Sequence, residues 1–167
     1  AERNYYTLVT SGMGAHRMNV PKELAEYKLE RAEIVVYLPA DWNISDHEEK
    51  NYWPLRWLKI LARLPLEEDS WLGWGHSVPN GKPFAENTQL SSVLLINPEN
   101  VEEGAAVCQL PNGEEVNFYQ MIPLYEEEVN FKIQNGAETL LGKMGEISAV
   151  VDIHRLNVCE GFGRPKE

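Results

Sequence analysis

A two-residue turn signal, Asn112-Gly113, constrains the fold of this chain more than any other feature of its sequence. Asn-Gly favours the tight type I′ turn, whose twist matches that of two antiparallel strands. The flanking segments, Ala105–Leu110 and Glu115–Ile122, are therefore predicted to form a β-hairpin. We expect this hairpin to belong to the central sheet of the protein.

Apolar runs bounded by turn residues predict the other strands. A first strand is expected over Tyr5–Val9, where aromatic and apolar residues alternate, and a buried strand over Ala32–Leu38. Two further strands are predicted over Ser91–Ile96 and Ile147–Ile153.

The clearest helix is predicted over Pro54–Leu64, where apolar and basic residues separate onto two faces. Leu58 and Leu61 belong to the apolar stripe, which should pack on the sheet; the basic face consists of Arg56, Lys59 and Arg63. Pro54 is tolerated in a first helical turn but opposes an uninterrupted helix that starts further upstream. Shorter helices are predicted over Lys22–Lys28, Tyr125–Gln134 and Ala137–Met144.

These elements describe a single α+β domain over residues 1–167, built on one sheet. Neither an internal repeat nor a low-complexity linker divides the sequence. No apolar run approaches the ~20 residues that a membrane-spanning helix needs. We therefore expect a cytoplasmic protein that does not bind membranes.

The negative charge of the chain is concentrated in one part of the sequence. Residues 83–131 contain nine carboxylates and no basic residue, out of a net charge of −11 for the whole chain. Such a block favours basic partners and repels nucleic acid, although acidic surfaces also serve solubility alone. The carboxylates are those of Glu86, Glu99, Glu102, Glu103, Glu114, Glu115, Glu126, Glu127 and Glu128.

Motifs for metal, nucleotide or covalent chemistry are not found in this sequence. The four histidines do not form HExxH or a Cys/His cluster, and P-loop, GxGxxG and GxSxG patterns are missing. No catalytic residue, no metal ligand and no cofactor is therefore predicted. An enzyme that uses His76 with an acidic neighbour remains an alternative.

The segment from Trp71 to Gly81 combines two tryptophans, three glycines and His76. It could form a stacking surface for a sugar or a peptide, because glycine lets a ligand approach the backbone. In a regular strand, however, Trp71 and Trp74 would point to opposite faces. The alternative is that one tryptophan packs in the core and the glycines mark a bulge.

Short phrases spread over essentially the whole chain resemble the suppressor of fused (SUFU-like) domain in its bacterial form. Eight such blocks occur in the family's order, which makes the resemblance specific. They include Tyr6-Thr7-Leu8-Val9-Thr10-Ser11-Gly12-Met13, Val36-Tyr37-Leu38-Pro39-Ala40-Asp41-Trp42, Trp71-Leu72-Gly73-Trp74-Gly75-His76 and Ile122-Pro123-Leu124-Tyr125-Glu126-Glu127-Glu128. The resemblance implies a mixed, mostly antiparallel sheet flanked by helices, with the family's usual opening strand missing before Ala1.

The resemblance also implies a function that depends on the branch of the family. Animal members bind Gli transcription factors and restrain Hedgehog signalling, whereas bacterial members resemble immunity proteins that neutralise toxins, often nucleases. Neither branch is known for catalysis. Leu64 and Gly75 stand where the animal pattern has a tyrosine and an aspartate that grip the Gli peptide. The resemblance thus favours an immunity protein, with a peptide- or regulatory-protein-binding module as the alternative.

A basic toxin domain would be attracted by the acidic block, because complementary charge speeds association. The predicted partner-binding residues are Glu114, Glu115, Glu126, Glu127 and Glu128, together with Trp71, Trp74 and His76. We expect the two glutamate groups to lie close together, because the second hairpin strand leads directly into the next helix. Reversing the charges of residues 126–128 should then slow association without affecting stability.

Overall fold

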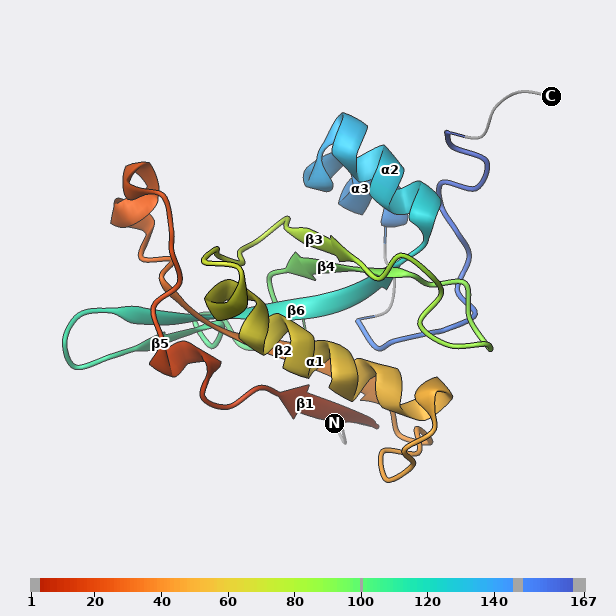
Figure 1. The fold of residues 1–167 in the computed structure, drawn as a ribbon, viewed down its shortest axis with the longest axis horizontal. Coiled ribbons are helices and arrows are strands. Elements are labelled where there is room, and N and C mark those ends of the chain that lie inside the picture. Colours follow the sequence, from red (N-terminus) through yellow and green to blue (C-terminus); the bar gives the residue numbers. More distant parts are fainter. Residues whose placement is uncertain (1–3, 100, 146–148, 164–167) are drawn as a thin grey trace.

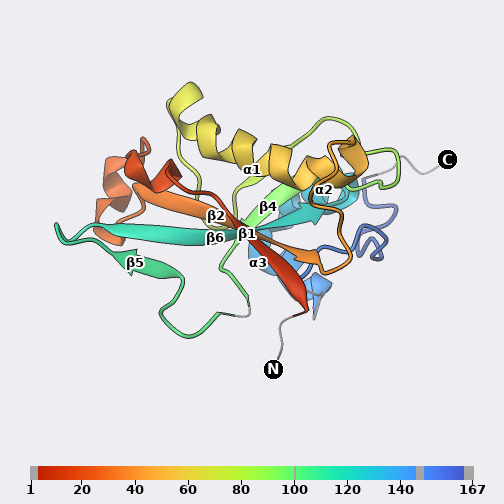
Figure 2. The ribbon, with the colours of Figure 1, turned by 90° about the horizontal axis from the view of Figure 1, so that it is seen from below.

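One six-stranded sheet organises the chain, with helices on both of its faces (Figures 1 and 2). The computed structural model describes residues 4–99, 101–145 and 149–163. The strands are β1 (Tyr5–Val9), β2 (Arg31–Pro39), β3 (Ser77–Pro79), β4 (Ser92–Ile96), β5 (Val107–Gln109) and β6 (Glu115–Leu124). The helices are α1 (Glu49–Glu67), α2 (Glu126–Asn135) and α3 (Ala137–Met144), with short 3-10 turns η1 (Met13–Ala15) and η2 (Lys22–Tyr27).

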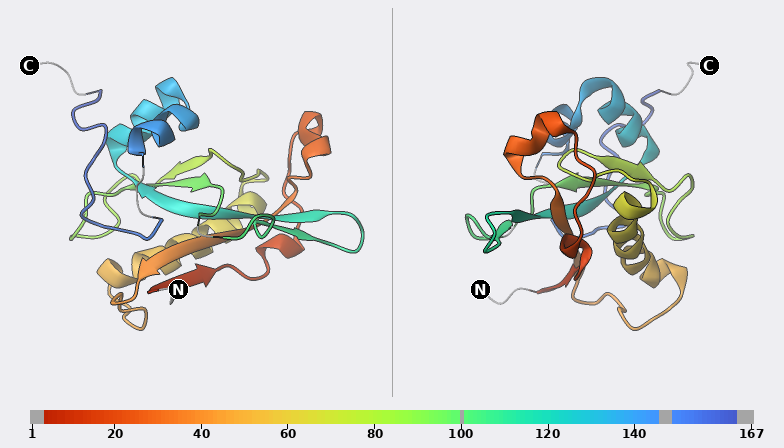
Figure 3. Two further views of the ribbon diagram at one scale, coloured as in Figure 1. Left: turned by 180° about the vertical axis from the view of Figure 1, so that it is seen from behind. Right: turned by 60° about the vertical axis from the view of Figure 1, so that its left-hand side comes forward.

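The strand order is β1-β2-β6-β4-β3, and β2–β6 is the parallel pair in an otherwise antiparallel sheet. The predicted hairpin is confirmed, since β5 pairs with the start of β6. Its turn is not the tight two-residue type I′ turn, because the Leu110 N–H donates to Glu114 O at 2.8 Å and, of Asn112 and Gly113, only Gly113 has a positive φ. Because β2 occupies one edge of β6, β5 and β4 follow each other along the opposite edge. The hairpin reaches beyond the rest of the sheet (Figure 3), while β6 forms its centre.

The period of two along each strand divides the core between the two faces of the sheet. From β4, Val93 and Leu95 join the cluster that contains Leu61 of α1. Leu94 and Ile96 point the other way and pack with residues of α2 and α3, such as Leu140. The α+β fold with a mixed, mostly antiparallel sheet is therefore confirmed.

Helix α1 starts earlier than predicted and continues through Pro54 and Pro65. A proline inside a helix costs about 3 kcal/mol, because a backbone hydrogen bond is lost. Here the first turns are held by tertiary packing, since Trp53 is fully buried and stacks on Phe84 with ring centroids 4.5 Å apart. The predicted faces are confirmed: Leu58 and Leu61 are buried, and the three basic side chains are exposed.

The prediction of a strand over residues 147–153 is wrong for residues 149–153, the part that the structure describes. Residues 147 and 148 lie outside the described part of the chain, and residues 149–153 contribute a single parallel bridge between Val150 and Tyr37. The segment 149–163, here called the C-terminal segment, runs instead beside the second half of β6. Side chains hold it there, because Gln120 Nε2 donates to Ala149 O at 2.9 Å and Arg155 Nη2 donates to Pro123 O at 2.8 Å.

Candidate functional site

Three consecutive glutamates begin α2, and each has a different environment. Glu126 is exposed and Glu127 is half-buried, whereas the side chain of Glu128 is 0% exposed. Helix geometry explains the difference, because Glu128 turns back to accept a hydrogen bond from the Tyr125 N–H at 3.0 Å. Only Glu126 and Glu127 therefore contribute charge to the surface.

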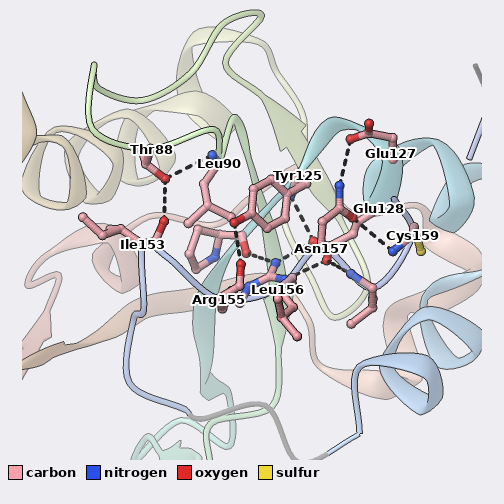
Figure 4. A network of polar contacts seen from close by, with 12 residues as sticks. Thr88, Leu90, Tyr125, Glu127, Glu128, Ile153, Arg155, Leu156, Asn157 and Cys159 are labelled. Atoms are coloured by element: carbon pink, nitrogen blue, oxygen red, sulfur yellow. Dashed lines mark hydrogen bonds and ion pairs between the residues drawn. The ribbon is translucent and has the colours of Figure 1, made fainter. Parts of the chain in front are cut away.

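The buried carboxylate of Glu128 is fully engaged with the C-terminal segment (Figure 4). Arg155 donates to both of its oxygens, at 2.6 and 2.5 Å, and the Val158 N–H donates at 3.1 Å. A guanidinium that binds a carboxylate with two parallel hydrogen bonds makes one of the stronger polar contacts in proteins. Reversal of Glu128 would leave Arg155 facing a buried cation, so the expectation that residues 126–128 can be reversed without loss of stability is wrong.

Further hydrogen bonds fix the backbone of the C-terminal segment on either side of Arg155 (Figure 4). Thr88 Oγ1 donates to Ile153 O at 3.1 Å, and Tyr125 Oη donates to Arg155 O at 2.6 Å. Asn157 Nδ2 donates to the Glu127 carboxylate at 3.0 Å. The start of α2 and the C-terminal segment therefore form one tightly connected unit.

A groove with a volume of about 830 Å³ lies between α2, the C-terminal segment and the loop that follows β3. Three carboxylates line it, from Glu126, Glu127 and Glu160, and Lys82 lies on the opposite side. Among its apolar walls are Ile133, 70% exposed, and Leu156, 86% exposed. This groove brings together surface charge and uncovered apolar area.

Glu114 and Glu115 lie at the far end of β6 and are occupied by local cations. Glu114 contacts Arg17 Nε at 2.7 Å and Arg31 Nη2 at 3.2 Å. Hydrogen bonds from these two guanidinium groups, that of Arg17 first, lower the pKa of Glu114 to about 2. Glu115 accepts from Gln109 Nε2 at 2.7 Å and lies 3.7 Å from Lys28 Nζ. These contacts tie the hairpin to the loops beside it.

The two glutamate groups are not brought together, which corrects the expectation from the sequence. Strand β6 separates them along its full length (Figure 1), and a strand advances about 3.3 Å per residue. Glu115 and Glu126 are thus held roughly 30 Å apart. Direct succession in sequence does not give proximity when the connecting element is an extended strand.

The tryptophan segment divides between the two faces of the sheet. Trp71 packs against the core on the α1 side, whereas Trp74 is 39% exposed and lines a hollow of about 340 Å³ on the α2–α3 side. The Trp71 ring folds over Gly73, where a Cβ would lie 2.7 Å from Trp71 Cζ3. The two tryptophans therefore do not form one stacking platform, although they lie in an irregular segment with a turn at residues 74 and 75, before β3, rather than in a regular strand.

His76 is a half-buried residue inside this segment. Its ring lies against Trp71 with centroids 4.4 Å apart, and Nδ1 accepts a hydrogen bond from the Gly73 N–H at 3.2 Å. Burial lowers the pKa of His76, which favours its neutral form. Among the hydrogen bonds of the described residues, the one that the His76 ring accepts comes from the backbone of its own segment.

Residues 4–99, 101–145 and 149–163 contain neither a cluster of metal ligands nor a membrane-spanning helix. In these ranges no three His, Cys, Asp or Glu side chains gather as a metal site would require. None of the helices in the described ranges combines the length and apolar character needed to cross a membrane.

The groove residues outside the acidic block were missed by the sequence analysis. Leu156 and Glu160 follow the last predicted element, where no periodicity placed them. Helical spacing places Ile133 on the same stripe as Val129, four residues earlier, so the sequence did not show that Val129 is buried while Ile133 is 70% exposed.

Comparison with known proteins gives a consistent result. The profile of the family described as Suppressor of fused protein (SUFU) matches residues 1–156. Among curated proteins, the uncharacterized protein UU111 of Ureaplasma parvum serovar 3 is 28% identical over 155 residues, which are 92% of this chain and 74% of that protein.

Solved structures share the fold at low sequence identity. Drosophila Suppressor of Fused superposes with a TM-score of 0.65 at 15% identity, covering 92% of this chain and 39% of that one. A SUFU homologue from Neisseria gonorrhoeae gives 0.64 at 19% identity, covering 93% of this chain and 71% of its own. A chain from the Sufu–Fu complex gives 0.60 at 15% identity, covering 75% and 57%. This chain thus spans only part of the length of the Sufu–Fu and Drosophila chains.

Proposed function

Because this chain belongs to the suppressor of fused family, we propose that it is a non-enzymatic protein-binding domain, namely an immunity protein that neutralises a basic toxin domain such as a nuclease. A relative solved as the Sufu–Fu complex supports protein binding as the general activity. Negative charge carries the finer proposal, since the net charge of the chain is −11 and the groove beside α2 is lined by the carboxylates of Glu126, Glu127 and Glu160 and by Lys82. A nuclease is basic where it contacts phosphate, so an acidic inhibitor gains both attraction and selectivity.

Glu126, which is exposed, and Glu127, which is half-buried and accepts a hydrogen bond from Asn157 Nδ2, are the best placed members of the predicted contact set. Glu114 and Glu115 are paired with Arg17, Arg31 and Lys28, which reduces their attraction for a partner. The proposed setting is the cytoplasm, with a protein partner and with no cofactor, nucleic acid or membrane.

The direct test uses the product of the gene next to that of this chain. The purified chain should form a complex with that product on size exclusion, and co-expression should restore growth to cells that make it. A neighbouring product that is not toxic, or a toxic one that neither binds the chain nor loses toxicity, would refute the immunity role.

The alternative is a peptide-binding module, and the free edge of the sheet favours it. Strand β3 ends the strand order, so one of its edges has no partner strand within the described residues. An extended peptide can add to such an edge by backbone hydrogen bonds. Pro79 limits this mode because it lacks an N–H. Peptide binding there would slow hydrogen exchange at Ser77, whereas a partner bound in the groove would leave that amide unchanged.

A further inference from the structure

The two most exposed large hydrophobic side chains among the described residues line the same groove. These are Leu156 at 86% and Ile133 at 70% exposure. A single exposed apolar side chain is ordinary, but two such side chains in one concave surface are typical of an interface. They come from separate elements, the last turn of α2 and the C-terminal segment.

These two side chains are exposed although the backbone that carries them is held in place by contacts. Arg155 Nη1 donates to Leu156 O at 3.0 Å, and the next residue, Asn157, is bound to Glu127. The backbone at Leu156 is thus fixed on both sides, and its side chain cannot turn into the core. Ile133 lies one helical turn after Val129 on the same stripe of α2, but only Val129 is buried against the core, which leaves Ile133 at the exposed end of that stripe. Both side chains are held where a partner would meet them.

The charges of the groove define the partner that fits. Glu126, Glu127 and Glu160 face it, opposed by Lys82, while the charge of Arg155 is neutralised by Glu128. The balance is therefore negative around two apolar positions. A cationic segment would be attracted, and an acidic one repelled.

We propose that this groove is the docking surface for a partner segment with two apolar side chains flanked by lysine or arginine. This assignment rests on the proposed function and deepens it, since it names where and how a basic toxin domain is held. The apolar side chains cover Ile133 and Leu156, and the flanking cations meet Glu126, Glu127 and Glu160. Apolar contact supplies most of the affinity, and the carboxylates supply orientation and association rate.

A synthetic peptide tests the chemistry of the groove without the natural partner. The probe is a 15-residue peptide, a length that permits about four helical turns, with leucines at positions i and i+4 flanked by lysines. In methyl NMR spectra, the signals of Ile133 and Leu156 should shift on titration. Peptides with alanine for leucine, or glutamate for lysine, should shift them much less. Shifts confined to other methyl groups would overturn the proposal.

Matched variants provide the second readout. The double variant Ile133→Ser with Leu156→Ser should bind the peptide at least tenfold more weakly. Leu66→Ser is the control, because Leu66 is 57% exposed on α1, away from the groove. A second pair of double variants tests the charges. Glu126→Lys/Glu160→Lys changes the groove, and its control is Glu67→Lys/Glu68→Lys, which makes an equal change of charge at exposed positions outside the groove. Equal binding by the groove variants and their controls would overturn the proposal.

The same variants separate this inference from the function on which it rests. If the double serine variant still binds and neutralises the toxin as strongly as the parent chain, the groove assignment fails and the immunity role stands. If the groove binds the cationic peptide but no toxin is neutralised, the groove stands and the immunity role fails. Concentration-dependent dimerisation that is lost in the double serine variant would assign the groove to a second copy of the chain and overturn the proposal.

Discussion

At the scale of single residues, one buried carboxylate decides how the end of the chain is attached. Glu128 binds Arg155 through both oxygens, and its side chain is 0% exposed. Removing one member of a buried ion pair leaves the other without compensation, which costs far more than the net contribution of the intact pair. Glu128 is therefore structural, although it stands beside two carboxylates that face the solvent.

Glu128→Gln is expected to lower the free energy of unfolding by about 3 to 5 kcal/mol, because the Arg155 charge loses its buried partner. Urea denaturation gives this quantity directly. Glu126→Gln is the control, and at an exposed position it should change stability by no more than about 0.5 kcal/mol. Replacing both members, with Glu128→Leu and Arg155→Met, should cost less than either single change. Equal effects of Glu128→Gln and Glu126→Gln would contradict this role.

The pKa of Glu114 makes the stability of the fold depend on pH in the acid range. Its pKa falls from an ordinary 4.5 to about 2 in the folded chain, because Arg17 and Arg31 stabilise the charged form. A lowered folded pKa adds stability that is fully present above pH 4.5 and is lost as the pH falls towards 2. The stability difference between the parent chain and Glu114→Gln should therefore shrink between pH 5 and pH 2, the range over which the carboxylate takes up its proton. A constant difference over this range would exclude the linkage.

At the scale of elements, the extent of α1 is determined more by its packing on the sheet than by the helix propensity of its residues. Its bounds were underestimated because Pro54 was weighed by its local cost, whereas the burial of Trp53 against Phe84 is a long-range contact that periodicity does not reveal. The first strand and α3 were predicted at their observed bounds, since their alternation and helical spacing are local patterns. The C-terminal segment was predicted wrongly, as a strand over residues 147–153, because side-chain hydrogen bonds such as that of Arg155 to Pro123 O, rather than a strand ladder, attach it to β6.

The contribution of α1 can be measured with two leucines on the same helix. Leu61→Ala should cost about 2 to 5 kcal/mol of unfolding free energy, because Leu61 is fully buried between helix and sheet and its truncation leaves a cavity. Leu66→Ala should cost less than about 1 kcal/mol, since Leu66 is largely exposed. Similar losses at both positions would show that the helix is not anchored through this face.

At the scale of the whole molecule, the acidic block is divided into separate regions rather than gathered on one face. The amount of charge is read from the sequence. The length of β6 sets the distance between Glu115 and Glu126, and only the fold shows that Glu128 is buried. The candidate site was therefore predicted in part, through Glu126 and Glu127. Its apolar members, Ile133 and Leu156, depend on an arrangement that no local pattern records.

Association kinetics with a basic toxin partner can locate the attracting charges. Glu126→Lys with Glu127→Lys should slow association and flatten its dependence on salt, because steering by exposed charges is screened over about 10 Å at 0.1 M salt. Glu102→Lys with Glu103→Lys is the matched control, an equal change at two exposed positions before β5. Stopped-flow rates at low and high salt compare the two. Equal slowing by both pairs would indicate net charge rather than a local contact.

The attachment of the C-terminal segment also has a consequence for synthesis of the chain. Its anchors on Tyr37, Thr88, Gln120 and Glu128 all precede it in sequence, so a ribosome releases every anchor before the segment that they hold. Until then Glu128 lacks the guanidinium that balances its charge, and the open edge of β6 is uncovered. Long-range closure of this kind makes this part of folding wait until residues 149–163 have been synthesised. During synthesis, the edge of β6 that residues 149–163 cover is therefore exposed to aggregation until that segment has been made.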